Sequence, residues 1–272
     1  MAEAGEGADR LAERLEAIDS VRQVLHALRA IARAQLPRAD AAAAEATVYL
    51  AWVDEVVERL VGPPRPGPAQ GPTLHVLLGP ERGYCGALPR QILAQAPAEG
   101  PLALVGRRLA EVAAEDPALL PRTRFVLPGA AGPEELDPAA EELASTILAR
   151  AGDAPVALLH PIEGGHRLHR VLLLSGPREP ARERPETWSP PEVVLRAAVA
   201  EALTGRLVLC LAEALRAEVR ARLAAAEAAI LACDVRREEL DQVLRALRRE
   251  RVTLEVLELA AARVARARSP GP

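Results

Sequence analysis

The sequence contains no lysine, since all 34 of its basic residues are arginine. A P-loop needs a lysine on the nucleotide phosphates and Schiff-base chemistry needs a lysine amine, so both are excluded. Aromatic residues make up only 2% of the chain, which leaves few side chains on which bases of single-stranded nucleic acid could stack. With a net charge of −4 as well, we expect no nucleic-acid partner.

Cysteine is also scarce. Cys85, Cys210 and Cys233 form an odd, widely spaced set, which predicts reduced thiols in the cytoplasm. Three histidines lie close together in strand-like sequence, where residues three apart face opposite ways, and no acid or cysteine cluster completes a metal site; they are His160, His166 and His169. We therefore expect no catalytic residue, no cofactor and no metal. The acidic, polar first residues also predict no signal peptide.

Glycine and proline are missing from two long stretches, residues 8–36 and 206–269. A helix over the second stretch would be about 95 Å long. Leucine and valine recur every three or four positions in both, which predicts amphipathic helices with coiled-coil-like stripes. Arginines and acids interrupt the pattern too often for a membrane span, so we expect no direct membrane insertion. Pro37 should disturb the first helix, which then resumes and runs to residue 60.

Short apolar runs and helical segments alternate between these two stretches. Such alternation predicts a doubly wound, Rossmann-like α/β domain. The expected strands are 73–78, 102–105, 124–127, 155–160 and 166–174, and the expected helices are 88–96, 107–115 and 137–150. A proline-rich linker (61–72) precedes the domain and an irregular connector (175–193) follows it.

The predicted fold class is therefore α/β plus a long antiparallel coiled coil. Each end helix has an apolar stripe that nothing else in the chain covers, so we expect the two to pair antiparallel as a shaft around the inserted α/β domain. The expected division is an N-terminal shaft helix (1–60), a foot domain (73–176) and a C-terminal shaft helix (191–269).

The stretch GPERGYCGALP at 79–89 directly follows the first expected strand, where a phosphate-binding loop would sit. Its glycines, at 79, 83 and 86, are spaced four and three apart, which fits neither the dinucleotide fingerprint nor the P-loop. We therefore predict a tight strand-to-helix turn with a structural thiol at Cys85. Trp52 and Trp188 are predicted to be packing residues rather than ligand platforms.

Basic residues gather near both ends of the expected shaft. Arg22, His26, Arg29 and Arg33 fall on one helix face, and Arg248 and Arg249 lie in a second arginine-rich segment. Two interpretations stay open at this point. The arginines form a solvated surface, or they meet acidic segments of a partner.

Three stretches, in the right order, resemble the gamma subunit of F-type ATP synthases. Residues 14–43 are similar to the family's N-terminal helix and residues 246–259 to its C-terminal signature. The loop ERGYCGALP resembles the family's Asp-Arg-Gly-Leu-Cys-Gly-Gly-Leu-Asn; the identical residues are Arg82, Gly83, Cys85, Gly86 and Leu88. Departures at Glu16, Asp19 and Pro37 indicate a divergent member, of the alternative sodium-type operons or a paralogue.

The resemblance implies a non-catalytic rotor that couples ion transport to ATP synthesis. The shaft would turn inside a ring of alpha and beta subunits, and the foot domain would bind the epsilon subunit and the membrane c-ring, peripheral to the cytoplasmic face of a bacterial plasma membrane. The expected partner-contact residues are Arg29, Arg33, Arg82, Gly83, Cys85, Gly86, Arg248, Arg249, Thr253 and Glu255. Two other classes stay open, a static coiled-coil scaffold or assembly protein with an α/β head, and a small-molecule enzyme that uses the α/β domain.

Overall fold

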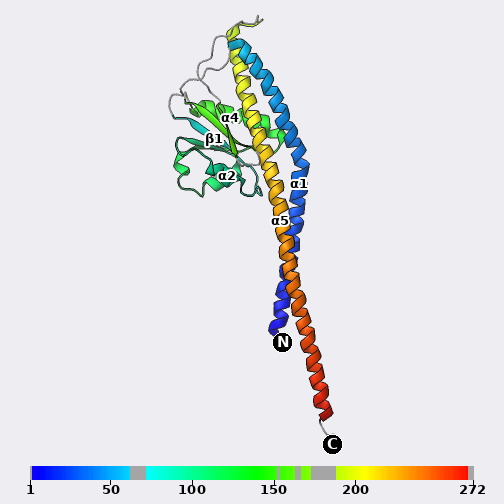
Figure 1. Ribbon diagram of the computed structural model, residues 1–272. Coiled ribbons are helices and arrows are strands. Elements are labelled where there is room, and N and C mark those ends of the chain that lie inside the picture. Colours follow the sequence, from blue (N-terminus) through cyan, green and yellow to red (C-terminus); the bar gives the residue numbers. More distant parts are fainter. Residues whose placement is uncertain (1, 62–71, 152–153, 163–166, 173–187, 269–272) are drawn as a thin grey trace. The chain divides into compact units, whose positions relative to one another are not determined.

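A computed structural model describes residues 2–61, 72–151, 154–162, 167–172 and 188–268 (Figure 1). Most of the predicted linker and connector, and His166, lie outside these ranges. By their internal contacts the residues divide into two units. The helical unit comprises Met1–Arg29 and Ala226–Pro272, and the sheet unit comprises Ala30–Ala225.

Two long helices each contribute to both units. They are α1 (Ala2–Val61) and α5 (Pro191–Arg268). Pro37 lies inside α1, which continues through it as one helix although the ring removes one backbone donor. Over the described residues, neither these helices nor the shorter ones contain an apolar stretch long enough to cross a membrane.

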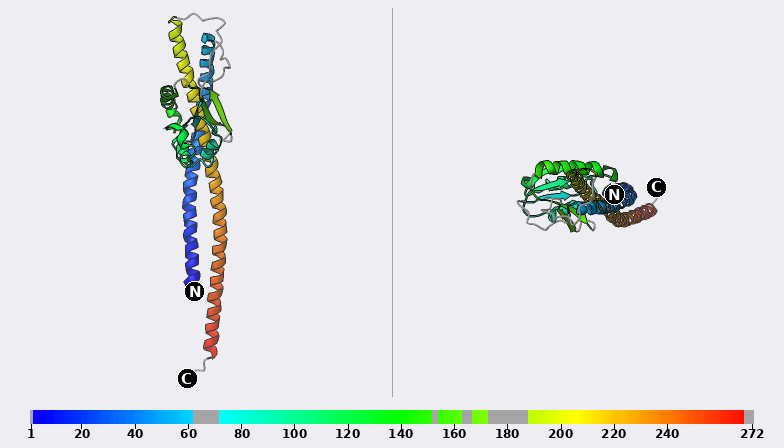
Figure 2. Two further views of the ribbon diagram at one scale, coloured as in Figure 1. Left: turned by 90° about the vertical axis from the view of Figure 1, so that its left-hand side faces the viewer. Right: turned by 90° about the horizontal axis from the view of Figure 1, so that it is seen from above.

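In the helical unit the two helices run antiparallel, side by side (Figure 2). Arg237 pairs with Asp19 at 2.9 Å, and Arg22 pairs with Asp234 at 2.6 Å. As the residue number rises on α1 it falls on α5, which is the signature of antiparallel pairing. The buried side chains of α5 in this unit include Ala226, Ile230, Leu240 and Leu244.

The sheet unit contains five strands in the order β3-β2-β1-β4-β5. Strands β1 to β4 are parallel, and β5 is antiparallel to β4 at the edge. Their bounds are Leu74–Leu78, Leu102–Val105, Thr123–Leu127, Val156–Ile162 and Arg167–Leu172. All five strands expected from the alternating pattern are present. The central strands β1, β2 and β4 are apolar along most of their length because both of their faces are covered.

Helices cover both faces of this sheet. One face packs on α4 (Leu136–Ala151), α5 and α1, in a core that includes Val76, Ile147 and Leu211. The other face packs on α2 (Leu88–Ala94) and α3 (Arg107–Ala113), in a core that includes Leu77, Ile92 and Leu109. Short 3-10 turns, Leu120–Arg122 and Pro133–Glu135, precede β3 and α4.

Helices α1 and α5 also pair antiparallel within the sheet unit. Arg220 pairs with Asp40 at 2.7 Å, and Arg206 pairs with Asp54. The structure thereby confirms the predicted fold class, in which paired N- and C-terminal helices flank an inserted doubly wound α/β domain.

Candidate functional site

The loop between β1 and α2, residues 79–87, has a tightly constrained backbone. Tyr84 and Gly86 have φ values of 61° and 59°, in the left-handed region. A Cβ at Gly79 would lie 2.7 Å from Cδ2 of Leu109, which is too close for any side chain. A Cβ at Gly83 would meet nothing within 4 Å, so packing inside the chain does not require glycine there.

A carboxylate from α5 holds this loop. Glu218, 2% exposed, accepts hydrogen bonds from the backbone N–H of Glu81 (2.8 Å) and of Arg82 (3.1 Å). Arg222 pairs with the same carboxylate and donates to Oε1 of Gln35 on α1 at 2.9 Å. Burial raises the pKa of the Glu218 carboxyl, while Arg222 and the two N–H groups act in the opposite direction.

Glu81 makes a second set of contacts at the carboxyl ends of the strands. Its carboxylate accepts the backbone N–H of Arg107 at 2.8 Å, after β2, and that of Gly129 at 2.7 Å, after β3. It also pairs with the Arg107 side chain. In a doubly wound sheet this edge is where ligands bind. Here the chain's own carboxylates occupy N–H groups that could otherwise hold a phosphate.

Cys85 lies beneath the loop, 3% exposed, in the core with Leu88 and Ile92. Its thiol donates to the carbonyl oxygen of Arg82 at 3.6 Å. Burial raises the pKa of the Cys85 thiol to about 11, so the nucleophilic thiolate is absent at neutral pH. Its position is that of the structural thiol that the sequence predicted.

Other parts of the loop face outward. The side chains of Arg82 and Tyr84 are exposed, Tyr84 to 71%. Gly83 and Tyr84 line an open hollow of about 350 Å³ together with Glu81, Arg108 and Glu111. Tyr84 was not among the predicted contact residues, although it is the largest side chain that the loop presents to solvent.

The predicted basic face of α1 is partly used within the chain. Arg22 pairs with Asp234 on α5, and Nη2 of Arg29 lies 3.1 Å from Nδ1 of His26. No acid occurs on α1 between Asp19 and Asp40. The acid that pairs with Arg22 comes from the antiparallel helix α5.

The predicted contact residues near the C-terminus lie on exposed helix. Arg248 and Arg249 are exposed, and Thr253 donates its hydroxyl hydrogen to the Arg249 carbonyl at 2.9 Å. Glu255 pairs with Arg251 at 3.1 Å. Apolar side chains are exposed on the same segment; they are Val252, Leu254, Val256, Leu257, Leu259 and Val264.

A second exposed apolar stripe lies on α1 in the sheet unit. Val48, Trp52 and Val56 follow one another at helical spacing of four and are each at least half exposed, Trp52 to 73%. Trp188 is also fully exposed, so the expectation that the two tryptophans are packing residues is wrong for this chain. In the sequence, the only sign of this stripe was the spacing of four between its apolar residues. Contiguous exposed apolar side chains mark interaction surfaces.

Two of the three predicted histidines lie together, on neighbouring strands. His160 on β4 faces His169 on β5, with Nε2 and Nδ1 3.1 Å apart. Burial lowers the pKa of His160 to about 4, with His169 and Arg216 contributing. Over the described ranges, no group of three or more histidine, cysteine or acidic residues is arranged to hold a metal.

The chain matches one family model and is similar in fold to solved structures. A family model described as ATP synthase matches residues 8–265. The cryo-EM structure of the Euglena gracilis mitochondrial ATP synthase rotor in rotational state 1 is similar, with a TM-score of 0.64 and 12% identity over 91% of this chain and 99% of that chain. The Tetrahymena thermophila mitochondrial ATP synthase central stalk/c-ring structure gives a TM-score of 0.60 and 15% identity over 76% and 99%. No curated protein matches the chain. At these identities the two structures establish a shared fold.

Proposed function

We propose that this chain, which belongs to the gamma-subunit family of ATP synthases and is a central-stalk subunit of that complex, couples ion-driven rotation of a membrane c-ring to ATP synthesis and hydrolysis. The observation that carries this proposal is the antiparallel pairing of α1 and α5, with ion pairs between them in each of the two units. A shaft that transmits torque needs long, continuous helices held against each other, and α5 has no glycine or proline from residue 206 to its end.

We propose separate partners for the shaft helices and for the foot domain. The segment with Arg248, Arg249, Thr253 and Glu255 would meet the ring of alpha and beta subunits, as would Arg29 and Arg33 of α1. Exposed apolar side chains on the same segment of α5 support a protein socket there, because water alone covers them in the single chain.

The proposed foot domain, residues 73–176, would bind the epsilon subunit and the c-ring. The loop offers Arg82, Gly83 and Gly86 at its surface, with Tyr84 added by the structure, and Cys85 supports them from beneath. The exposed stripe with Trp52 lies in the same unit and supports a second contact. The division into shaft helices 1–60 and 191–269 is part of this proposal.

The way the strand ends are used supports a non-catalytic role. The N–H groups that a doubly wound fold would offer to a nucleotide are bonded to Glu81 and Glu218. This disfavours a small-molecule enzyme at that edge.

We also propose a location for the chain. As part of the complex it would lie at the membrane surface, at the cytoplasmic face of a bacterial plasma membrane.

Co-expression with alpha, beta and epsilon subunits of the same organism tests the proposal. The chain should co-purify with them as one complex that hydrolyses ATP, and calorimetry should detect no micromolar ATP binding to the isolated chain. A chain that binds ATP alone, or that never joins the other subunits, would contradict the proposal.

A further inference from the structure

A buried carboxylate on α5 fixes the loop after β1 from a distant part of the sequence. Glu218 accepts the N–H groups of Glu81 and Arg82, which lie 137 and 136 positions away. Hydrogen bonds to an ionised acceptor are stronger and more directional than neutral ones. These two hydrogen bonds therefore fix the position of the loop along the axis of α5, in addition to keeping the loop against the helix.

The same carboxylate connects to α1. Its partner Arg222, 6% exposed, lies one helical turn further along α5 and also donates to Gln35. Among the ion pairs of the described residues, this is the one whose two side chains are both almost completely buried, at 7% and 3% exposed. Gln35, Arg222 and Glu218 form a continuous polar chain from α1 across α5 to the loop.

Glu81 continues this chain into the sheet. Its backbone N–H goes to Glu218, and its side chain accepts the N–H groups of Arg107 and Gly129. The loops after three neighbouring strands are thereby gathered on one connection to the helices. The other contacts between the long helices and the inserted domain are weaker constraints. Apolar packing is non-directional, and the ion pair of Arg38 on α1 with Glu134 (3.1 Å) is exposed to solvent, where such a pair contributes only about 0–1 kcal/mol.

We infer that Glu218 is the positioning residue that makes the sheet domain and the paired helices turn as one body. This inference rests on the proposed rotor function, because only a rotor must carry torque between the two. Without the Glu218 carboxylate the loop is held on α5 by apolar packing alone, and torque from the sheet domain is partly lost as slippage.

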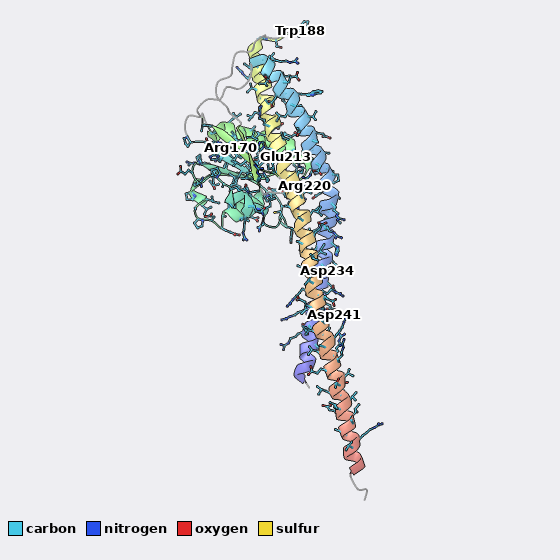
Figure 3. All side chains as sticks on the ribbon, in the orientation of Figure 1. Arg170, Trp188, Glu213, Arg220, Asp234 and Asp241 are labelled. Carbon is cyan, nitrogen blue, oxygen red and sulfur yellow. The ribbon has the colours of Figure 1, made fainter. Side chains whose placement is uncertain are left out.

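Hydrogen exchange on the full-length chain tests the contact itself. Glu218→Gln keeps the volume and one acceptor oxygen, but its NH2 group cannot accept an N–H. Glu213→Gln is the matched control, since Glu213 lies on the same helix (Figure 3), is partly buried, and pairs with Arg216 instead of the loop. We expect exchange at Glu81 or Arg82 to rise about tenfold in Glu218→Gln and to stay unchanged in the control. Unchanged exchange in both would overturn the inference.

Coupling in the complex tests the role. In vesicles with the reconstituted complex, a voltage-sensitive dye reports transport of either proton or sodium while ATP hydrolysis is measured. Glu218→Gln should hydrolyse ATP near the wild-type rate but build at least twofold less potential per ATP, whereas Glu213→Gln should match the wild type. Because Glu218→Gln leaves a buried guanidinium without its carboxylate, the double variant with Arg222→Met is measured beside it, and stands in for it if the single variant unfolds.

Three outcomes separate the inference from its premise. Full coupling in a variant whose loop amides are released would overturn the inference alone. A folded variant that fails to assemble would overturn it too, because Glu218 would then serve partner binding. If the wild-type chain forms no coupled complex, the proposed function fails, and with it the torque role of Glu218.

Discussion

Burial decides which single residues of this chain carry charge or react. Cys85 and Cys210 sit in apolar cores, and His160 is 4% exposed beside His169. Each is held in its neutral form, since desolvation disfavours the charged form of any ionisable group. Burial also raises the pKa of the Glu218 carboxyl, but the N–H groups and the guanidinium that surround it act in the opposite direction.

Thiol reactivity should follow this burial. The pKa is raised to about 11 for Cys85 and to about 12 for Cys210, whereas Cys233 is only half-buried. We therefore expect a thiol reagent at pH 8 to modify Cys233 rapidly in the folded chain, and all three thiols in denaturant. Peptide mapping that finds Cys85 labelled first would show that this loop opens in solution.

Stability should fall in mild acid because of His160. Its pKa is about 4 when folded against 6.5 when unfolded, so the unfolded chain binds the proton more readily. The free energy of unfolding should therefore decrease as pH falls from 6.5 to 4, by up to about 3 kcal/mol. Denaturant titrations of His160→Phe should show a shallower pH slope than the wild type, and an unchanged slope would contradict the role of His160.

At the scale of elements, the loop after β1 is shaped by two kinds of glycine. Gly79 and Gly106 lie where strand ends approach each other, and a Cβ at Gly106 would sit 2.5 Å from the Gly79 carbonyl oxygen. Gly83 faces open space. Packing therefore requires glycine at position 79, where the loop leaves β1, but does not require glycine at position 83 on its surface.

Two alanine substitutions should separate these roles. Gly79→Ala should lower the unfolding free energy by about 1–3 kcal/mol, because the methyl group overlaps Leu109. Gly83→Ala should change it by less than about 0.5 kcal/mol. Chemical denaturation measures both. Equal losses in the two variants would mean that Gly83 carries a backbone constraint of its own.

The register of the helix pair can be tested by cross-linking. In a chain with Cys85, Cys210 and Cys233 changed to Ser, a short bis-maleimide should join Asp19→Cys to Arg237→Cys, because those side chains meet. The pair Arg22→Cys and Arg251→Cys is the off-register control, about 25 Å out of place along α5. Cross-linking of the control instead would contradict the antiparallel register.

At the scale of the whole molecule, exposed charge and exposed apolar side chains are the surfaces that the proposed partners would contact. The chain has a net charge of −4 overall, yet arginines concentrate on its two long helices near the ends of the sequence. Exposed ion pairs contribute only about 0–1 kcal/mol each and are screened by salt. Many weak contacts of this kind suit a shaft that must move past its partners rather than lock to them.

Reversing four of these charges tests the idea. Arg29, Arg33, Arg248 and Arg249 changed together to Glu should leave the isolated chain folded but weaken assembly or ATP-driven turnover at low ionic strength. A version with Gln at the four positions should show a smaller defect, and added salt should shrink the difference. If assembly and turnover are unchanged, the arginines form only a solvated surface.

Local pattern was sufficient for the elements. The period of apolar residues and the missing glycines and prolines predicted both long helices, and the five strands were predicted from their apolar runs. The first helix was expected to resume after Pro37, and α1 is indeed one helix from Ala2 to Val61. The tryptophans were misjudged because exposure depends on what packs against a helix face, and a single sequence does not show that.

The sequence by itself determined the two long helices, the alternating α/β segment and the turn at 79–89, since each depends on residues a few positions apart. Only the tertiary structure decided that Glu218 closes this loop, that Asp234 meets Arg22, and that His160 meets His169. Contacts such as Glu218–Glu81 join residues 137 positions apart, and they arise only when packing of the apolar stripes and strands has already brought the backbone together.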